Sequence, residues 1–64
     1  MNDTPEEGTV LRSKTMKGLL GVFKKVIDDE ERGRHYLVTI LDAGESSFRI
    51  GAPISDPVEN WELA

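Results

Sequence analysis

The stretch KGLLGVFKKVIDDEE, residues 17–31, constrains the fold most, because it fits two incompatible structures. As a helix, it would gather its apolar side chains and Met16 into one stripe at helical spacing. Gly18 and Gly21 argue against that helix, since each interior glycine costs about 1 kcal/mol relative to alanine. In a turn followed by a strand, glycines serve where the backbone needs a positive φ or a close approach. We therefore predict a turn and then a strand, and keep a helix at about residues 14–31, packed on a hairpin, as the alternative.

The remaining segments favour β structure. TVLRS (residues 9–13) and HYLVTIL (residues 35–41) contain β-branched residues, and the second is apolar enough for a central strand. DAGE predicts a turn and SSFRIG a strand that completes a hairpin, while APISDP predicts a loop or a proline-limited edge strand. VENWELA predicts a short helical turn that leads into a final strand. We expect a mostly β fold, a small antiparallel barrel or curled sheet. It would be formed by residues 9–64 as a single small domain after a flexible tail at residues 1–8.

A family resemblance agrees with this fold. The run GTVLRSKTMKGLLGVFKKVIDDEERGRHYLVTI, residues 8–40, resembles the KOW motif of SH3-like barrels. A glycine opens a strand, a loop follows, and the pair KG precedes a second glycine by three residues, ahead of another strand and a variable loop. The resemblance implies an SH3-like antiparallel barrel. Because KOW-bearing barrels often contact RNA or protein, it also implies a binding module.

Charge is distributed unevenly along the chain. From residue 10 to residue 27 the chain has five basic residues and no acidic one, whereas from residue 28 onward it has nine acidic and three basic residues. A basic face of this kind meets either phosphate or an acidic protein surface. We predict that the five basic residues form the partner-binding site: Arg12, Lys14, Lys17, Lys24 and Lys25.

The sequence lacks the residues that a catalytic or metal site needs. With no cysteine and one histidine, the chain forms neither a disulfide nor a Cys/His zinc cage, and the acidic run at residues 28–31 lacks the alternating ligands of a calcium loop. No serine lies in a nucleophile motif, and His35 is expected to be a packed or surface residue. We therefore expect no cofactor, no metal and no catalytic residue. An accessory subunit that completes an enzyme site across an oligomer interface is the remaining enzymatic alternative.

The small size of the chain bears on its partners. Sixty-four residues bury only a thin core, so either a homo-oligomer or a separate partner is expected to add stability. Four aromatic residues are too few to fill that core and also stack nucleic-acid bases, which favours a protein partner over RNA or another single strand. Trp61 is expected to be the lid of the core, with an exposed interface anchor as the alternative. The chain has neither an apolar run long enough to span a membrane nor a basic, then apolar, signal peptide, so we expect a cytoplasmic protein without membrane contact.

Overall fold

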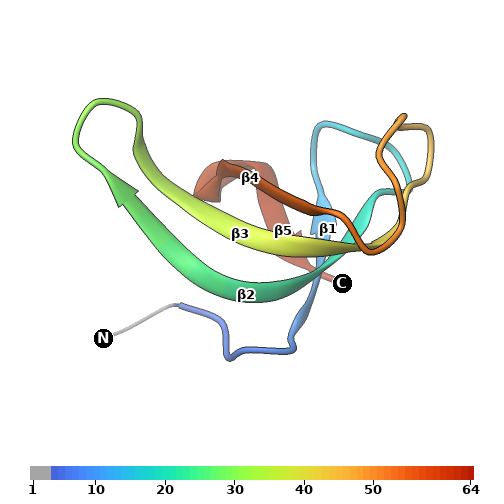
Figure 1. Cartoon of the computed structure of the whole chain (residues 1–64), viewed down its shortest axis with the longest axis horizontal. Helices are drawn as coiled ribbons and strands as arrows, with labels where there is room; N and C mark the ends of the chain where they lie inside the picture. The colour runs from blue at the N-terminus through green and yellow to red at the C-terminus, as the bar shows by residue number, and fades with distance from the viewer. Residues whose placement is uncertain (1–3) are drawn as a thin grey trace.

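A computed structural model describes residues 4–64 of the chain (Figure 1). Five antiparallel strands form one sheet in the order β4-β3-β2-β1-β5. The edge strands β4 and β5 share no ladder, so the sheet is curled but open. The predicted mostly β fold is confirmed, as a curled sheet and not as a closed barrel. The elements are β1 (Val10–Ser13), β2 (Leu20–Asp29), β3 (Gly33–Asp42), β4 (Pro53–Pro57), the 3-10 helix η1 (Val58–Asn60) and β5 (Trp61–Leu63).

The alternative of a helix at about residues 14–31 is wrong, because Leu20–Asp29 is strand β2. The two glycines explain the choice. Gly18 has a φ of 79°, which suits a turn and not a helix. Gly21 lies so close to β3 that a Cβ atom there would be 2.7 Å from Cγ2 of Val38. Both glycines thus serve the turn and the close approach that the strand prediction requires.

A β-bulge in β2 decides which of its side chains enter the core. Phe23 is paired with Val38 and Lys25 with Leu37, so Lys24 is an extra residue without an opposite partner. Without the bulge, the two-residue period of a strand would turn Lys25 to the same face as the buried Phe23. The extra residue moves Val26 to that face instead, where it packs against the core. Both lysines are therefore exposed.

The core occupies the concave face of the sheet. Phe23 and Tyr36 meet edge to face there, with ring centroids 5.1 Å apart and planes at 82°. Trp61, on β5, is 5% exposed. It closes the core as the predicted lid and is not an exposed anchor. The buried apolar side chains are Leu11, Leu19, Phe23, Tyr36, Val38, Ile40 and Trp61.

The predicted strand SSFRIG is wrong, since residues 43–52 form a loop between β3 and β4. Ser46 competes with ladder formation there, because its hydroxyl donates to the Ala43 carbonyl (2.6 Å) and accepts from the Phe48 N–H (3.3 Å). The hairpin partner of β3 is instead β4, which pairs from His35↔Pro57 to Thr39↔Pro53. The predictions of a proline-limited edge, a helical turn and a final strand for residues 52–64 are confirmed.

The N-terminal segment lies beneath the bent β2–β3 hairpin (Figure 1). The Gly8 N–H donates to the Phe23 carbonyl (2.9 Å), and the Phe23 N–H donates to the Thr9 carbonyl (2.8 Å). Of the predicted flexible tail, residues 1–3 lie outside the described residues. Within residues 4–64, no helix has the length and apolar character to cross a membrane.

Candidate partner-binding surface

Three of the five predicted basic residues lie away from the middle of the sheet. Arg12 is on β1, where its Nε donates to Glu62 Oε2 on β5 at 2.8 Å. This exposed ion pair occupies the guanidinium of Arg12. Lys14 and Lys17 are in the loop that connects β1 to β2, at the opposite end of the sheet from the β2–β3 hairpin (Figure 1). The structure therefore does not gather all five residues into one group.

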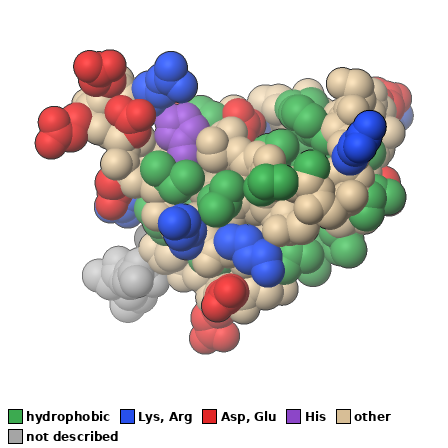
Figure 2. All heavy atoms as spheres, viewed as in Figure 1, with side chains coloured by type: hydrophobic (Ala, Val, Ile, Leu, Met, Phe, Trp, Pro, Cys, Tyr) green, Lys and Arg blue, Asp and Glu red, His purple; other side chains and the backbone are tan. Residues whose placement is uncertain are grey.

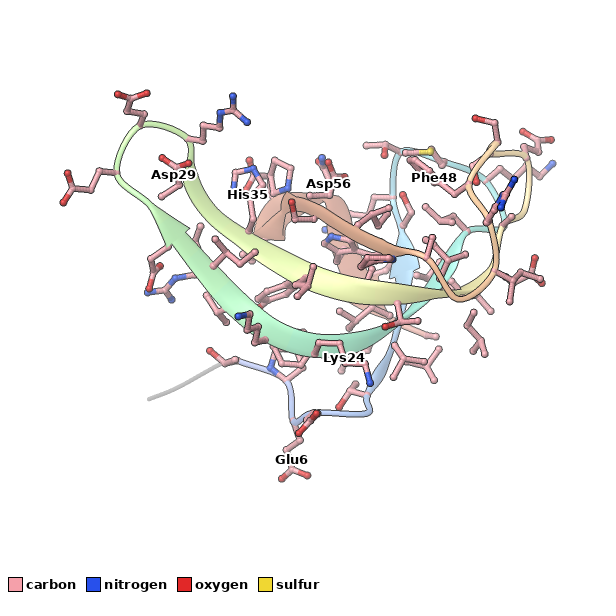
Figure 3. All side chains as sticks on the ribbon, in the orientation of Figure 1. Glu6, Lys24, Asp29, His35, Phe48 and Asp56 are labelled. Atoms are coloured by element: carbon pink, nitrogen blue, oxygen red, sulfur yellow. The ribbon has the colours of Figure 1, made fainter. Side chains whose placement is uncertain are left out.

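Lys24 and Lys25 are together at the bulge in the middle of β2. Among the described residues, neither lysine has a carboxylate within ion-pair distance. Asp29, at the hairpin end of β2, is four or five residues farther along an extended strand, or roughly 13–17 Å away. Figure 3 shows this separation between Lys24 and Asp29. Figure 3 also shows Glu6 below Lys24, so the two lysines are cations without an ion pair among the described residues, with an acidic side chain on the N-terminal segment nearby.

Half-buried apolar side chains lie beside the two lysines. The register pairs Lys25 with Leu37 and places Val22 and Ile27 on the same convex face of the sheet. Each of these three apolar residues is only partly covered by the rest of the protein. In Figure 2, hydrophobic side chains extend across this face, with two basic side chains directly below them and acidic side chains below those. We call this set the outer-face patch: Val22, Lys24, Lys25, Ile27 and Leu37.

The apolar members of the patch were not identified from the sequence as site residues. Val22 and Ile27 are five residues apart, a spacing that would put them on opposite faces of a regular strand. The bulge between them restores them to one face. The sequence did contain a signal for the bulge. Two consecutive lysines separate the apolar residues Phe23 and Val26, and both lysines stay out of the core only if the strand has an extra residue between these two apolar residues.

Aromatic side chains are mostly unavailable for contact with a partner. Phe23, Tyr36 and Trp61 are buried, and only Phe48 is exposed, at 37%. Phe48 is in the loop between β3 and β4, outside the outer-face patch. The surface therefore lacks the row of exposed rings on which single-stranded bases stack.

A polar hollow of about 130 Å³ contains His35 and Asp29, together with Ile27, Arg32 and Ser55. Asp29 Oδ1 accepts the backbone N–H groups of Glu31 (2.8 Å) and Arg32 (3.1 Å), and these bonds lower the pKa of the Asp29 carboxyl. That carboxylate therefore caps the hairpin turn.

The hollow lacks the contacts of a catalytic site. In the described part of the chain, no hydrogen bond joins His35 to Asp29 or to Ser55, as a nucleophile and base pair requires. The same part contains no group of three or more His, Asp or Glu side chains able to hold a metal ion. Comparisons with protein-family models, with curated proteins and with solved structures found no match for this chain.

Proposed function

We propose that this chain is a small non-enzymatic binding or regulatory module that acts through a protein partner. The partner presents acidic groups to Lys24 and Lys25 and apolar groups to Val22, Ile27 and Leu37. The observation that carries this proposal is the position of two lysines, without ion pairs among residues 4–64, beside half-buried apolar side chains on one convex face. Protein interfaces commonly combine an apolar centre with charged residues that steer the partner into place.

We also propose that the module is SH3-like, as its resemblance to the KOW motif implies, and the strand architecture supports this. A single curled antiparallel sheet, with two ten-residue strands, β2 and β3, between shorter ones, is what a small barrel requires before closure. Such a sheet buries its concave face and leaves its convex face for contact with a partner. This arrangement suits a binding module better than an enzyme, which needs convergent polar groups in a concave site.

RNA binding is the second candidate. The two adjacent lysines, Lys24 and Lys25, favour it to a limited degree. Two phosphate contacts on a single strand would give a slope of log K against log salt of about −1.4, and five would give about −3.5. A rise in salt from about 50 to 200 mM would then weaken binding about sevenfold in the first case and about 130-fold in the second. Three buried aromatic residues and the net charge of −4 both favour the protein partner.

The test is a titration of the ¹⁵N-labelled chain followed by NMR. One probe is an acidic amphipathic peptide with leucines on one helical face, and the other is a mixed-sequence single-stranded RNA. We expect the peptide to shift the amide signals of β2 between Val22 and Ile27 and that of Leu37. The double substitution Lys24→Glu with Lys25→Glu should weaken peptide binding at least tenfold, because each like-charge contact costs free energy.

A matched control comes from the other two lysines of the chain, Lys14 and Lys17. Lys14→Glu with Lys17→Glu changes the net charge by the same amount in the loop between β1 and β2. We expect this variant to change peptide affinity less than threefold. Equal losses in the two double variants would show that binding depends on net charge alone and would contradict the patch. Micromolar RNA binding with a steep salt slope, abolished by the substitutions at positions 24 and 25, would replace the protein partner with RNA.

A further inference from the structure

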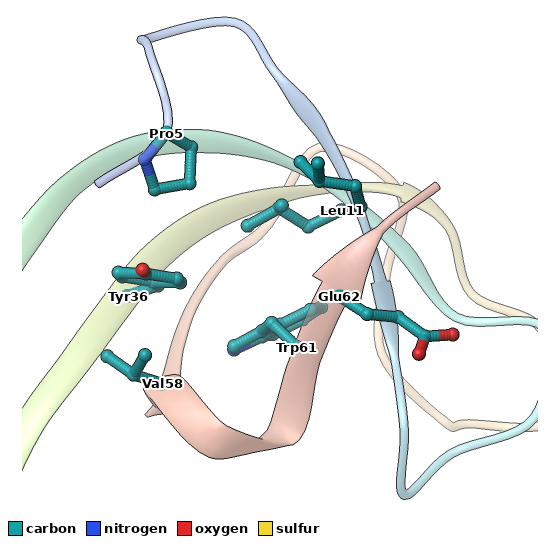
Figure 4. A pocket seen from close by; sticks show the side chains of 7 residues that line it. Pro5, Leu11, Tyr36, Val58, Trp61 and Glu62 are labelled. Atoms are coloured by element: carbon teal, nitrogen blue, oxygen red, sulfur yellow. The ribbon is translucent and has the colours of Figure 1, made fainter. Parts of the chain in front are cut away.

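A pocket of about 190 Å³ lies beside β5, on the side where the sheet stays open (Figure 4). Its lining is mostly apolar and includes Pro5, Leu11, Tyr36, Val58, Trp61 and Leu63. Leu63 pairs with the buried Leu11 and shares its face of the sheet, yet it is 68% exposed. The concave face of the sheet is therefore left partly uncovered at β5.

The indole N–H of Trp61 is a buried donor without an acceptor. Among the described residues, Trp61 Nε1 has no hydrogen-bond partner, although the residue is only 5% exposed. Figure 4 shows the nitrogen end of the indole directed toward the space between Tyr36 and Val58, which both line the pocket. Buried donors in folded proteins nearly always have an acceptor, because an unmade hydrogen bond costs free energy. An acceptor supplied from outside the chain would remove that cost.

The edge of β5 supplies three backbone groups next to the same pocket that have no partner among the described residues. The Lys14 N–H donates to the Asn60 carbonyl (2.7 Å), and the Ala64 N–H donates to the Val10 carbonyl (3.2 Å). By the alternation of an antiparallel ladder, the backbone groups of Trp61 and Leu63 then face away from β1. The Trp61 N–H bonds to the Val58 carbonyl within η1. The Trp61 carbonyl and both the N–H and the carbonyl of Leu63 remain at the free edge.

We propose that β5 binds an extended segment of a protein partner as an additional strand, with one apolar side chain of that segment in the pocket. The Trp61 carbonyl and the Leu63 N–H supply the ladder bonds, as in other cases of strand addition to a sheet edge. A cavity of about 150 Å³ holds a benzene molecule, so this pocket accepts one side chain the size of leucine or phenylalanine. A polar acceptor of the segment bonds to Trp61 Nε1 once the half-buried Val58 side chain turns aside. This site is separate from the outer-face patch and does not depend on it.

The test uses the only tryptophan of the chain as the reporter. The probes are capped pentapeptides, acetyl-Lys-Thr-X-Thr-Lys-amide, in which X is leucine, phenylalanine or alanine. The ¹⁵N-labelled chain is titrated with each peptide, and the signals of the Trp61 indole N–H and the Leu63 amide are followed by NMR. We expect both signals to shift with the leucine and phenylalanine peptides, and the alanine peptide to bind about tenfold more weakly, because it leaves the pocket unfilled. Unmoved signals at about 5 mM of every peptide would overturn the proposal.

Two further comparisons separate strand addition from simple occupation of the pocket. Leu63→Pro removes the free N–H of β5, whereas Leu63→Ala keeps it, so the first should weaken binding at least fivefold more than the second. A thermal melt of each variant checks that the fold is retained. Acetyl-leucine-methylamide fills the pocket but is too short to form a strand. Binding of this compound as tightly as the leucine pentapeptide, or equal affinities of the two variants, would overturn strand addition.

Discussion

Gly21→Ala tests the strand assignment of residues 20–29 most directly. A Cβ atom at position 21 would lie 2.7 Å from Val38 Cγ2 and 2.9 Å from Val38 Cβ. Val38 is fully buried, so its side chain has no free space into which it can move. The substitution therefore forces either a shift of β2 away from β3 or a strained rotamer at Val38.

The magnitude follows from two opposing effects. Overpacking of a tight core typically costs about 1–3 kcal/mol. Loss of backbone freedom in the unfolded chain offsets about 0.4–1 kcal/mol of that cost. We expect the free energy of unfolding to fall by about 1–2 kcal/mol. In a domain of this length each kcal/mol lowers Tm by about 4–8 °C, so Tm should fall by about 4–16 °C.

The assay is urea unfolding followed by circular dichroism, applied to a double-mutant cycle with Val38→Ala. Val38→Ala alone destabilises the core, but it removes the atoms that the new methyl group would meet. In that background Gly21→Ala should cost almost nothing, which gives a coupling free energy of about 1 kcal/mol or more. A rise in stability for the single variant, or additivity within about 0.5 kcal/mol, would refute the reasoning.

Three other predictions concern single polar groups. The backbone hydrogen bonds that lower the pKa of Asp29 stabilise the folded state above the unfolded pKa of 3.8. The stability advantage over Asp29→Asn should therefore disappear as the pH falls through the lower, folded pKa in urea titrations between neutral and acidic pH. Trp61→Phe removes the unpaired N–H along with some apolar area, so it should lower the unfolding free energy by less than about 1 kcal/mol. Trp61→Ala should cost about 3–5 kcal/mol in the same assay, and equal costs would contradict the role of the N–H. Ser13→Ala removes the acceptor of the Thr15 and Met16 N–H groups at a buried position, and it should cost about 1–3 kcal/mol; an unchanged Tm would show that water replaces the hydroxyl.

The sequence by itself determined where most strands form. The alternating and β-branched residues of HYLVTIL, the glycines at positions 18 and 21, and the prolines of β4 each act on the backbone nearby. Such local effects are visible without knowledge of what packs against them. The clustering of basic residues before residue 28 was equally visible, and it included the two lysines of the outer-face patch.

Only the tertiary structure decided the face on which each side chain lies. The bulge at Lys24 depends on pairing with β3, and it moves Val22, Lys25 and Ile27 onto one face although their spacing alone would separate them. The loop at residues 43–52 depends on contact with a distant turn, since the Glu45 N–H donates to the Lys17 carbonyl (3.0 Å). The open edge at β5 arises because the sheet curls without closing, and burial leaves the indole N–H of Trp61 without an acceptor among the described residues. Register, loop contacts and closure are all set by residues far apart in the chain, and no local propensity records them.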